Sequence, residues 1–396
     1  MTFLGGELGS LKESFIALVL SALAAVFAGL FLGRYDEFLL LIPGLIMLIP
    51  GSTNMRGAIF AALGSRLGSS MHLGTIDKLT LRSTALRNNI YSSITLNLSL
   101  SLTLGIIAWA LSRALGFGSV SVFHFIFISV IGSVIAAAAL LAVMIFIMFR
   151  AYARGWDPDN IHAPLITSIG DFVTIPAIML AAFLSLSLSI VVLEVVTYIA
   201  VLAIVADIGS MVVRKKAVRM IVIESFPIIL LSGILSTLAG TFIEPHLLRF
   251  AALPGLLVLV PALLGMGGNI GNIFASRVAT KFHLGTLTFN LRGLKSEIQR
   301  TYLLSIVIYP LIGIINYIFS RAVGLETVGF FIDVFLATFI GIAVTTLVII
   351  FAFIMGVLSY KFNWDPDNTL NPTVTGIADF FGLLTFITVL IVFGIV

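Results

Sequence analysis

Two aspartates stand at matching places in otherwise apolar stretches of the sequence. Asp171 follows Pro164 by seven residues, and Asp379 follows Pro372 by the same interval. Because proline favours the first turn of a helix, each carboxylate is expected about two turns, or ~10 Å, inside its helix. A carboxylate at that depth in a hydrocarbon layer is costly and marks an ion or substrate path by default; the alternative is a buried Asp that joins helices. Its recurrence in both places favours an ion site.

Oxygen-bearing and small residues accompany these aspartates. Thr167 and Thr375 lie four residues earlier, so each shares a helix face with its aspartate. A stretch upstream of Asp379 supplies a second set of candidates: Gly267, Gly268, Asn269 and Asn272. Glycines at this spacing are typical of close helix packing, but they would also let the helix open and turn its carbonyls toward an ion. Carboxylate, amide and carbonyl oxygens without sulfur suit a hard cation.

The matching stretch upstream of Asp171 is different. Residues 54–58 read Asn-Met-Arg-Gly-Ala, so Asn54 and Arg56 are the ion-path candidates there. A buried arginine would repel a cation unless it were paired, and Asp171 is a candidate partner. Otherwise Arg56 snorkels or bridges helices. It also leaves open a carrier of an organic anion, in which Arg56 binds the substrate and the aspartates carry protons.

Four further acids could collect cations at a membrane surface. Glu13 and Glu224 stand at the starts of apolar segments, where an acid also favours a helix N-terminus. Asp157 and Asp365 each begin an Asp-Pro-Asp-Asn turn, where turn and cap chemistry is the simpler explanation. The sequence contains no nucleophile–base pair, P-loop or dinucleotide-binding fingerprint, so we expect a protein that is not an enzyme.

The elements that must position these residues are transmembrane helices. The chain is 60% apolar and only 10% charged, whereas soluble domains carry roughly 25% charged residues, so membrane lipid is its expected solvent. Eleven apolar segments approach the ~20 residues that cross a bilayer. They are about 13–33, 38–64, 90–112, 122–149, 164–186, 187–212, 219–242, 252–276, 302–320, 330–358 and 371–394.

The distribution of charge predicts the orientation of these segments. Most of the 22 lysines and arginines fall on one side of the membrane when the segments are counted as eleven. Basic loops favour the cytoplasmic side, so we expect a multi-pass plasma-membrane protein with a cytoplasmic N-terminus and an external C-terminus. The chain has no cysteine, which excludes thiolate metal sites, and no basic patch with interleaved aromatics that would bind nucleic acid.

The sequence also repeats itself. Trp-Asp-Pro-Asp-Asn at 156–160 recurs at 364–368, a spacing of 208 residues that also relates Asp171 to Asp379. Upstream, a spacing of 211 residues relates His-Leu-Gly-Thr at 72–75 to 283–286. We therefore predict an all-α protein with two parallel five-helix repeats, 1–186 and 213–396, and a connecting transmembrane helix at 187–212. A pathway is expected at their pseudo-two-fold interface.

These motifs together resemble a known family. Pro-x-x-x-Gly-Met-Gly-Gly-Asn-x-Gly-Asn at 261–272, followed by Asp-Pro-Asp-Asn and then Pro-x-x-Thr-x-x-x-Asp at 372–379, resembles the membrane domain of MgtE magnesium channels. The duplication with a connecting helix resembles the solute carrier 41 magnesium transporters. The resemblance implies a pore lined by the second and fifth helices of each repeat. It also implies that Asp171 and Asp379 bind Mg²⁺ largely through water. This sequence lacks the CBS regulatory domains of bacterial MgtE, so we expect no gating by such domains.

Several functional hypotheses remain open from the sequence. The chain is a Mg²⁺ channel or uniporter, or an exchanger coupled to Na⁺ or H⁺ that uses the same site. The organic-anion carrier is a third hypothesis, and a membrane scaffold that transports nothing is a fourth. Because the duplication already supplies two units, we expect the protein to function as a monomer.

Overall fold

The computed structural model describes residues 2–72, 83–118, 120–153, 158–211, 216–283, 291–362 and 366–396, and these form helices and short connections. The helices are α1 (Thr2–Arg34), α2 (Asp36–Leu41), α3 (Leu45–His72), α4 (Thr84–Ala114), α5 (Val122–Ala153), α6 (Pro158–Ser187), α7 (Ile190–Ser210), α8 (Lys216–Gly240), the 3₁₀ turn η1 (Glu244–His246), α9 (Leu247–Ala252), α10 (Gly255–His283), α11 (Leu291–Ala322), α12 (Phe330–Phe362) and α13 (Pro366–Val392). The expected all-α polytopic membrane fold is confirmed.

The long helices among the described residues correspond one to one with the eleven predicted segments. Within the described ranges, ten helical segments are long and apolar enough to cross a membrane by length and composition. The helix that does not reach this apolarity is α3, which carries Arg56, Asn54 and several small polar residues.

Two predicted starts were wrong, for a common reason. The helices that carry the aspartates begin at Pro158 and Pro366, six residues before Pro164 and Pro372. The proline of each Asp-Pro-Asp-Asn motif therefore occupies the first helical position, where its missing N–H costs nothing. Asp171 and Asp379 thus lie 13 residues inside their helices, about 20 Å of rise from the helix start.

The described chain forms two compact units, and each combines parts of both sequence halves. Unit 1 contains residues 1–36 and 245–396, and unit 2 contains residues 37–244. Consequently α1, from the first half, belongs to the unit built from α10 to α13, and α8, from the second half, belongs to the unit built from α3 to α7. The predicted repeats describe the sequence, whereas the compact units exchange the first long helix of each repeat.

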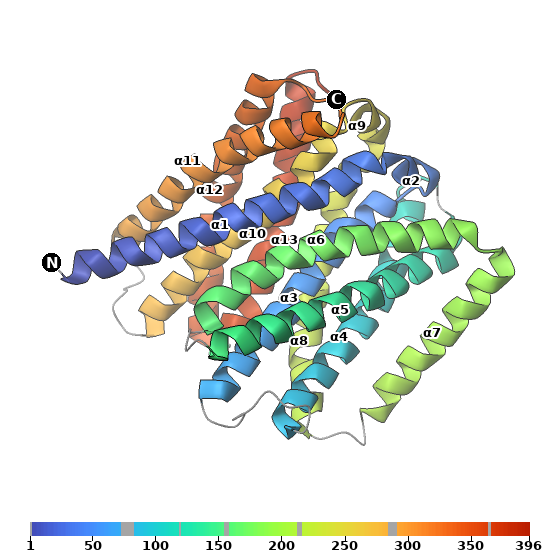
Figure 1. Ribbon diagram of the computed structural model, residues 1–396, viewed down its shortest axis with the longest axis horizontal. Coiled ribbons are helices and arrows are strands. Elements are labelled where there is room, and N and C mark those ends of the chain that lie inside the picture. The colour runs from blue at the N-terminus through green and yellow to red at the C-terminus, as the bar shows by residue number, and fades with distance from the viewer. Residues whose placement is uncertain are drawn as a thin grey trace. The chain divides into compact units, whose positions relative to one another are not determined.

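Unit 1 is a bundle centred on α10. Helices α1, α11, α12 and α13 all pack against α10, and Figure 1 shows α1 running beside it. Close approach is possible because small residues line the contact: a side chain at Gly29 of α1 would meet the backbone of Val258 in α10.

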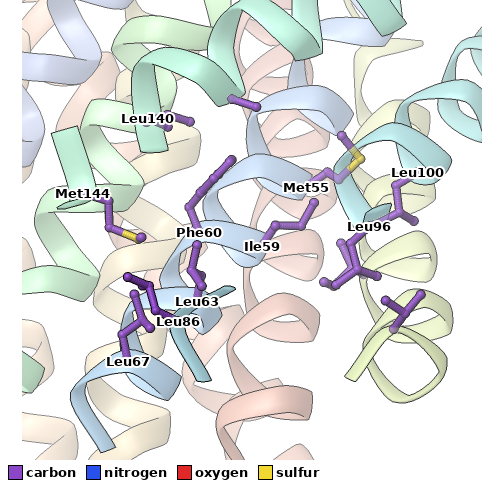
Figure 2. Packing of buried hydrophobic residues seen from close by; sticks show 13 residues of the cluster. Met55, Ile59, Phe60, Leu63, Leu67, Leu86, Leu96, Leu100, Leu140 and Met144 are labelled. Carbon is purple, nitrogen blue, oxygen red and sulfur yellow. The ribbon is translucent and has the colours of Figure 1, made fainter. Parts of the chain in front are cut away.

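Unit 2 is built in the same way around α3. Helices α4, α5, α6 and α8 pack against it. Its apolar core includes Met55, Ile59, Leu63 and Leu67, which recur every fourth residue along one face of α3 and meet residues of α4, α5 and α8 (Figure 2). This face fixes the rotation of α3 and therefore the directions in which its polar residues project.

Candidate cation site

Asp379 lies in the middle of α13 in unit 1 and is buried, with 4% of its surface exposed. The apolar length of α13 explains why this residue is deep: the candidate membrane span runs from Pro372 to Val392. A buried carboxylate at this depth fits the prediction of an intramembrane acid.

The glycines of α10 position that helix against α13 and α12. A side chain added at Gly268 would contact Thr375 of α13, and one at Gly271 would clash with Val348 of α12 and Val374 of α13. The second and fifth helices of this repeat therefore pack directly together, with Gly268 against the turn that precedes Asp379. In contrast, α10 is continuous from Gly255 to His283, so the expected opening of the helix at Gly267 and Gly268 is not present. Packing is what the glycines provide.

Side-chain amides rather than backbone carbonyls supply free oxygen here. The Nδ2 atom of Asn272 donates to the hydroxyl of Thr375 at 3.1 Å, which leaves the buried Oδ1 atom of Asn272 without a hydrogen-bond partner. Thr375 is one turn before Asp379 on α13. Asn272 is thus bonded to the turn that precedes a buried carboxylate, and an amide oxygen without a donor among the described residues is a ligand that suits a hard cation.

Asn269 has a different role. Its Nδ2 atom donates to the hydroxyl of Ser21 in α1 at 2.6 Å, and both side chains are buried. This bond ties α1 to α10. Ser21 was not predicted from the sequence as a site residue, although the 211-residue spacing relates it to Ser232 in the other half.

In unit 2, Asp171 of α6 is 9% exposed and sits beside the corresponding contact between the second and fifth helices. A side chain at Gly170 would come within 3.9 Å of Gly57 in α3. Asp171 and Arg56 are the chain neighbours of these two glycines, so the close approach of α3 and α6 brings both residues to the same level of the unit.

Arg56 is completely buried, and most of its guanidinium is unsatisfied. Its Nη1 atom donates to the carbonyl of Ser52 on the same helix at 3.1 Å, whereas Nε and Nη2 have no hydrogen-bond partner among the described residues. The predicted pairing with Asp171 is therefore not formed there, and neither is a snorkelling conformation, because no part of Arg56 is exposed. The first half carries a buried positive charge where the second half has Gly267.

Asn54 makes the contact in unit 2 that Asn269 makes in unit 1, but from a position one turn earlier along its helix. Its Nδ2 atom donates to the hydroxyls of Ser232 at 2.9 Å and Ser236 at 2.6 Å in α8, and its Oδ1 atom is buried without a partner. Each unit thus joins its exchanged first helix to its second helix through an asparagine and a serine. Among the described residues, the second helix of each unit also has a buried amide oxygen without a hydrogen-bond partner, on Asn54 or Asn272.

The remaining candidates are less informative. Glu224 is exposed on α8. Asp157 and Asp365 lie outside the described residues, and of Glu13 and Thr167 only the backbone, in α1 and α6, is described. Among the side chains that the structure describes, no group of three or more His, Cys, Asp or Glu could hold a metal ion. A cation here would have to keep much of its water, as Mg²⁺ does.

The fold and these sites define a class: a helical, multi-pass membrane protein with a buried carboxylate on the fifth helix of each half. Comparison with known proteins specifies the family. The sequence model of MgtE, described as a divalent cation transporter, matches residues 49–182 and 260–389, once in each half. The chain belongs to this family.

Curated relatives agree with that assignment. Solute carrier family 41 member 3 of Rattus norvegicus is 26% identical over 93% of this chain and 84% of its own length. The Mus musculus member 3 is 25% identical over 93% of this chain and 79% of its own, and member 2 of Gallus gallus is 25% identical over 61% of this chain and 43% of its own. No solved structure matches the chain significantly. The protein is therefore a divalent cation transporter by family.

Proposed function

We propose that this protein carries partly hydrated Mg²⁺ across the membrane along a path lined by α10 and α13 in unit 1 and by α3 and α6 in unit 2. The observation that carries the proposal is the buried Asp379, one turn from a threonine whose partner Asn272 keeps an unpartnered buried oxygen. Mg²⁺ binds through one or two carboxylates and retains several waters, so Asp171 and Asp379 suffice as fixed negative charges. Enzymatic activity is no part of the proposal.

The inequality of the two halves supports a coupled exchanger over a symmetric channel. Arg56 places an unneutralised charge in unit 2 where unit 1 has a glycine. A fixed positive charge in only one half makes the two halves of the path unequal for a cation, which a symmetric channel does not need. Na⁺ or H⁺ is the candidate coupling ion. The unpartnered donors of Arg56 are also the observation that favours the second candidate, an organic-anion carrier.

The arrangement around this path is also proposed. The sequence repeats 1–186 and 213–396, joined by the helix at 187–212, give a working monomer in which lipid faces the exposed apolar side chains of α7, such as Leu202. The charge of the loops supports a plasma-membrane protein with its N-terminus in the cytoplasm and its C-terminus outside.

Flux into proteoliposomes tests the proposal. Mg²⁺ entry is measured with an internal indicator for the wild type, Asp379→Asn and Asp171→Asn, with and without an opposing Na⁺ or pH gradient. Asp207→Asn is the control, because Asp207 lies within the apolar helix α7, which packs on α4 and α5, and accepts from Thr95 of α4 at 2.7 Å. We expect the wild type and the control to transport, and Asp379→Asn to lose transport.

Three results would argue against this account. Normal flux in both Asp379→Asn and Asp171→Asn would make the aspartates structural. Flux that does not change with either gradient would favour a channel. Loss of organic-anion uptake in Arg56→Met, together with no Mg²⁺ movement in the wild type, would favour the anion carrier.

A further inference from the structure

A second buried polar feature of unit 1 lies between α11 and α12, and the cation site does not include it. It consists of Thr301, Ser305, Tyr309 and Asn316 on α11 and Asp333 and Thr345 on α12, here called the α11–α12 seam. None of these side chains is more than 3% exposed. Buried polar groups inside an apolar helix pair are costly unless they are satisfied, so a row of them needs a reason.

Asp333 is the least satisfied member of the seam. It is 0% exposed, and neither carboxyl oxygen has a hydrogen-bond partner among the described residues. The side chain of Asn316 lies beside it without a bond of good geometry, and the Nδ2 atom of that asparagine is also unpartnered. Asp333 stands in the first turn of α12, but it makes no capping bond there. Helix capping therefore does not account for it.

Among the residues that the structure describes, no positive charge pairs with Asp333. On α11, the basic residue nearest to it in sequence is Arg321, which is half exposed and pairs with Glu326 at 3.3 Å. Tyr317 packs edge-to-face on Phe330. The other helices packed on α12 are α10, which has no titratable side chain between Gly255 and Phe274, and α13, which has none between Phe380 and Val392. An ionised carboxylate here would be buried and unpaired, whereas a protonated one would carry no charge.

Hydroxyl groups continue from the middle of the seam toward the other end of α11. The hydroxyls of Ser305 and Thr345 are 3.0 Å apart, and the Tyr309 hydroxyl lies beside Thr345 without a partner of good geometry. Ser305 and Thr301 each donate to the carbonyl one turn earlier, at 2.9 and 2.8 Å. That row ends at Glu297.

Glu297 lies four residues before Thr301 on α11, so it places a second buried acid next to the end of the seam that is opposite Asp333. It is 1% exposed and lies 3.2 Å from Arg300 and 3.6 Å from Arg277. Both arginines are about one-fifth exposed, so this end of the row is close to solvent. Between Tyr309 and Asn316, about two turns of α11 carry no polar side chain and pack directly on α12.

The first half has no such acids. With the 208-residue spacing, Phe125 stands in place of Asp333 and Asn89 in place of Glu297. Phe125 is fully buried, so packing at this position does not require an acid. Asn89 simply accepts from Arg66 at 2.9 Å. The carboxyl groups are therefore a property of one half and not of the fold.

The seam is also separate from Asp379. Phe335 of α12 packs on Phe393, just beyond the end of α13, with ring centroids 5.5 Å apart. Phe393 lies 14 residues beyond Asp379, or about 21 Å of helix rise. Asp333 is two residues before Phe335 and is therefore at the far end of α13 from Asp379.

We infer that the α11–α12 seam is a proton path, and that Asp333 is the proton-binding group at one end of it. This inference rests on the cation transport proposed above and names H⁺ as the coupling ion. The helices α11 and α12 are in direct contact between Asn316 and Tyr309, so they must part there during transport. The Asp333 carboxyl then releases its proton to the water that enters, and the hydroxyls of Tyr309, Thr345 and Ser305 pass it on toward Glu297 and the solvent at that end. Asp333 is left as a carboxylate until it is reprotonated from its own end of the seam.

The experiment records Mg²⁺ and internal pH in the same proteoliposomes, with the membrane potential clamped. Three variants interrupt the seam with little change of shape: Asp333→Asn, Tyr309→Phe and Thr345→Val. Thr346→Val is the matched control, because Thr346 is the next residue on α12, is exposed and bonds Tyr302 at 2.8 Å. We expect proton counterflow to fall by about 10²-fold in the three seam variants and to be unchanged in the control.

Infrared spectroscopy provides a test that does not depend on transport. A buried carboxylic-acid C=O band in the folded wild type that is lost in Asp333→Asn, but kept in Asp379→Asn, supports the inference even if no Mg²⁺ moves. If the wild type transports Mg²⁺ without proton movement, the proton path is refuted and the cation proposal stands. Absence of the band refutes a protonated Asp333, and absence of Mg²⁺ flux under all gradients refutes the cation proposal.

Discussion

Replacing Arg56 by methionine should stabilise the protein. Arg56 is fully buried, and two of its three guanidinium nitrogens have no hydrogen-bond partner among the described residues. Methionine has a similar length and an adaptable apolar side chain, so it can fill the same space. The change removes a charge that no described residue of unit 2 neutralises.

The size of the effect follows from the bonds at stake. Each buried donor without a partner costs about 1–3 kcal/mol, and the single bond lost, from Nη1 to the carbonyl of Ser52, is worth about 1.5–3 kcal/mol because the donor is charged. The net expectation is a gain of about 2 kcal/mol, within the range measured when buried ions are replaced by apolar residues. For a unit the size of residues 37–244, that corresponds to a rise in Tm of about 4–8 °C.

The assay is thermal unfolding of the purified protein in detergent, with Arg66→Met as the matched control. Arg66 lies on the same helix, but its Nε atom donates to Asn89 at 2.9 Å and its Nη2 atom to Ser93 at 3.4 Å. We expect the Arg56 variant to gain stability and the Arg66 variant to lose it. A lower Tm in Arg56→Met would refute the reasoning and would mean that its guanidinium is paired in the folded protein.

Two pairs of substitutions test contacts, one pair in each unit. Gly271→Ala should destabilise unit 1 by about 1–3 kcal/mol in thermal unfolding, because its Cβ would clash with Val348, whereas Gly268→Ala should cost less; equal effects would contradict the packing described. Glu244→Ala should cost about 1–3 kcal/mol and Glu244→Gln much less, because the Oε1 atom of Glu244 accepts from the backbone N–H of Gly44 at 2.7 Å; an unchanged Tm in Glu244→Ala would show that this bond contributes nothing.

Hydropathy predicted the helices well but not where they start. The helix α11 begins at Leu291, whereas its apolar segment begins near residue 302. The extra turns contain Lys295 and Glu297, which an apolar window rejects although both are compatible with a helix at a membrane surface. Helical propensity continues where lipid ends, so an apolar window marks the span and not the helix.

The exchange of α1 and α8 between the units could not be predicted from the sequence. Hydrophobic patterns define helices but do not say which helices pack together. In a duplicated chain the ambiguity is doubled, because Ser21 and Ser232 offer equivalent hydroxyls to either unit. The contacts with Asn269 and Asn54 are visible only in three dimensions.

The buried aspartates could be predicted, because an acid in an apolar run is rare and the repeat marks it twice. The α11–α12 seam was missed, although its members recur at helical spacing from Thr301 to Asn316. Single hydroxyls are ordinary in membrane helices, and only the burial of Asp333 without a partner gives the row its meaning.

Direct binding of Mg²⁺ to the purified protein is the measurement that tests the central claim most directly. Equilibrium dialysis would compare the wild type, Asp379→Asn and the control Asp207→Asn at the same ionic strength. The account predicts saturable Mg²⁺ binding in the wild type and the control, and its loss in Asp379→Asn. Equal binding by Asp379→Asn and the wild type would contradict a cation site built around that carboxylate.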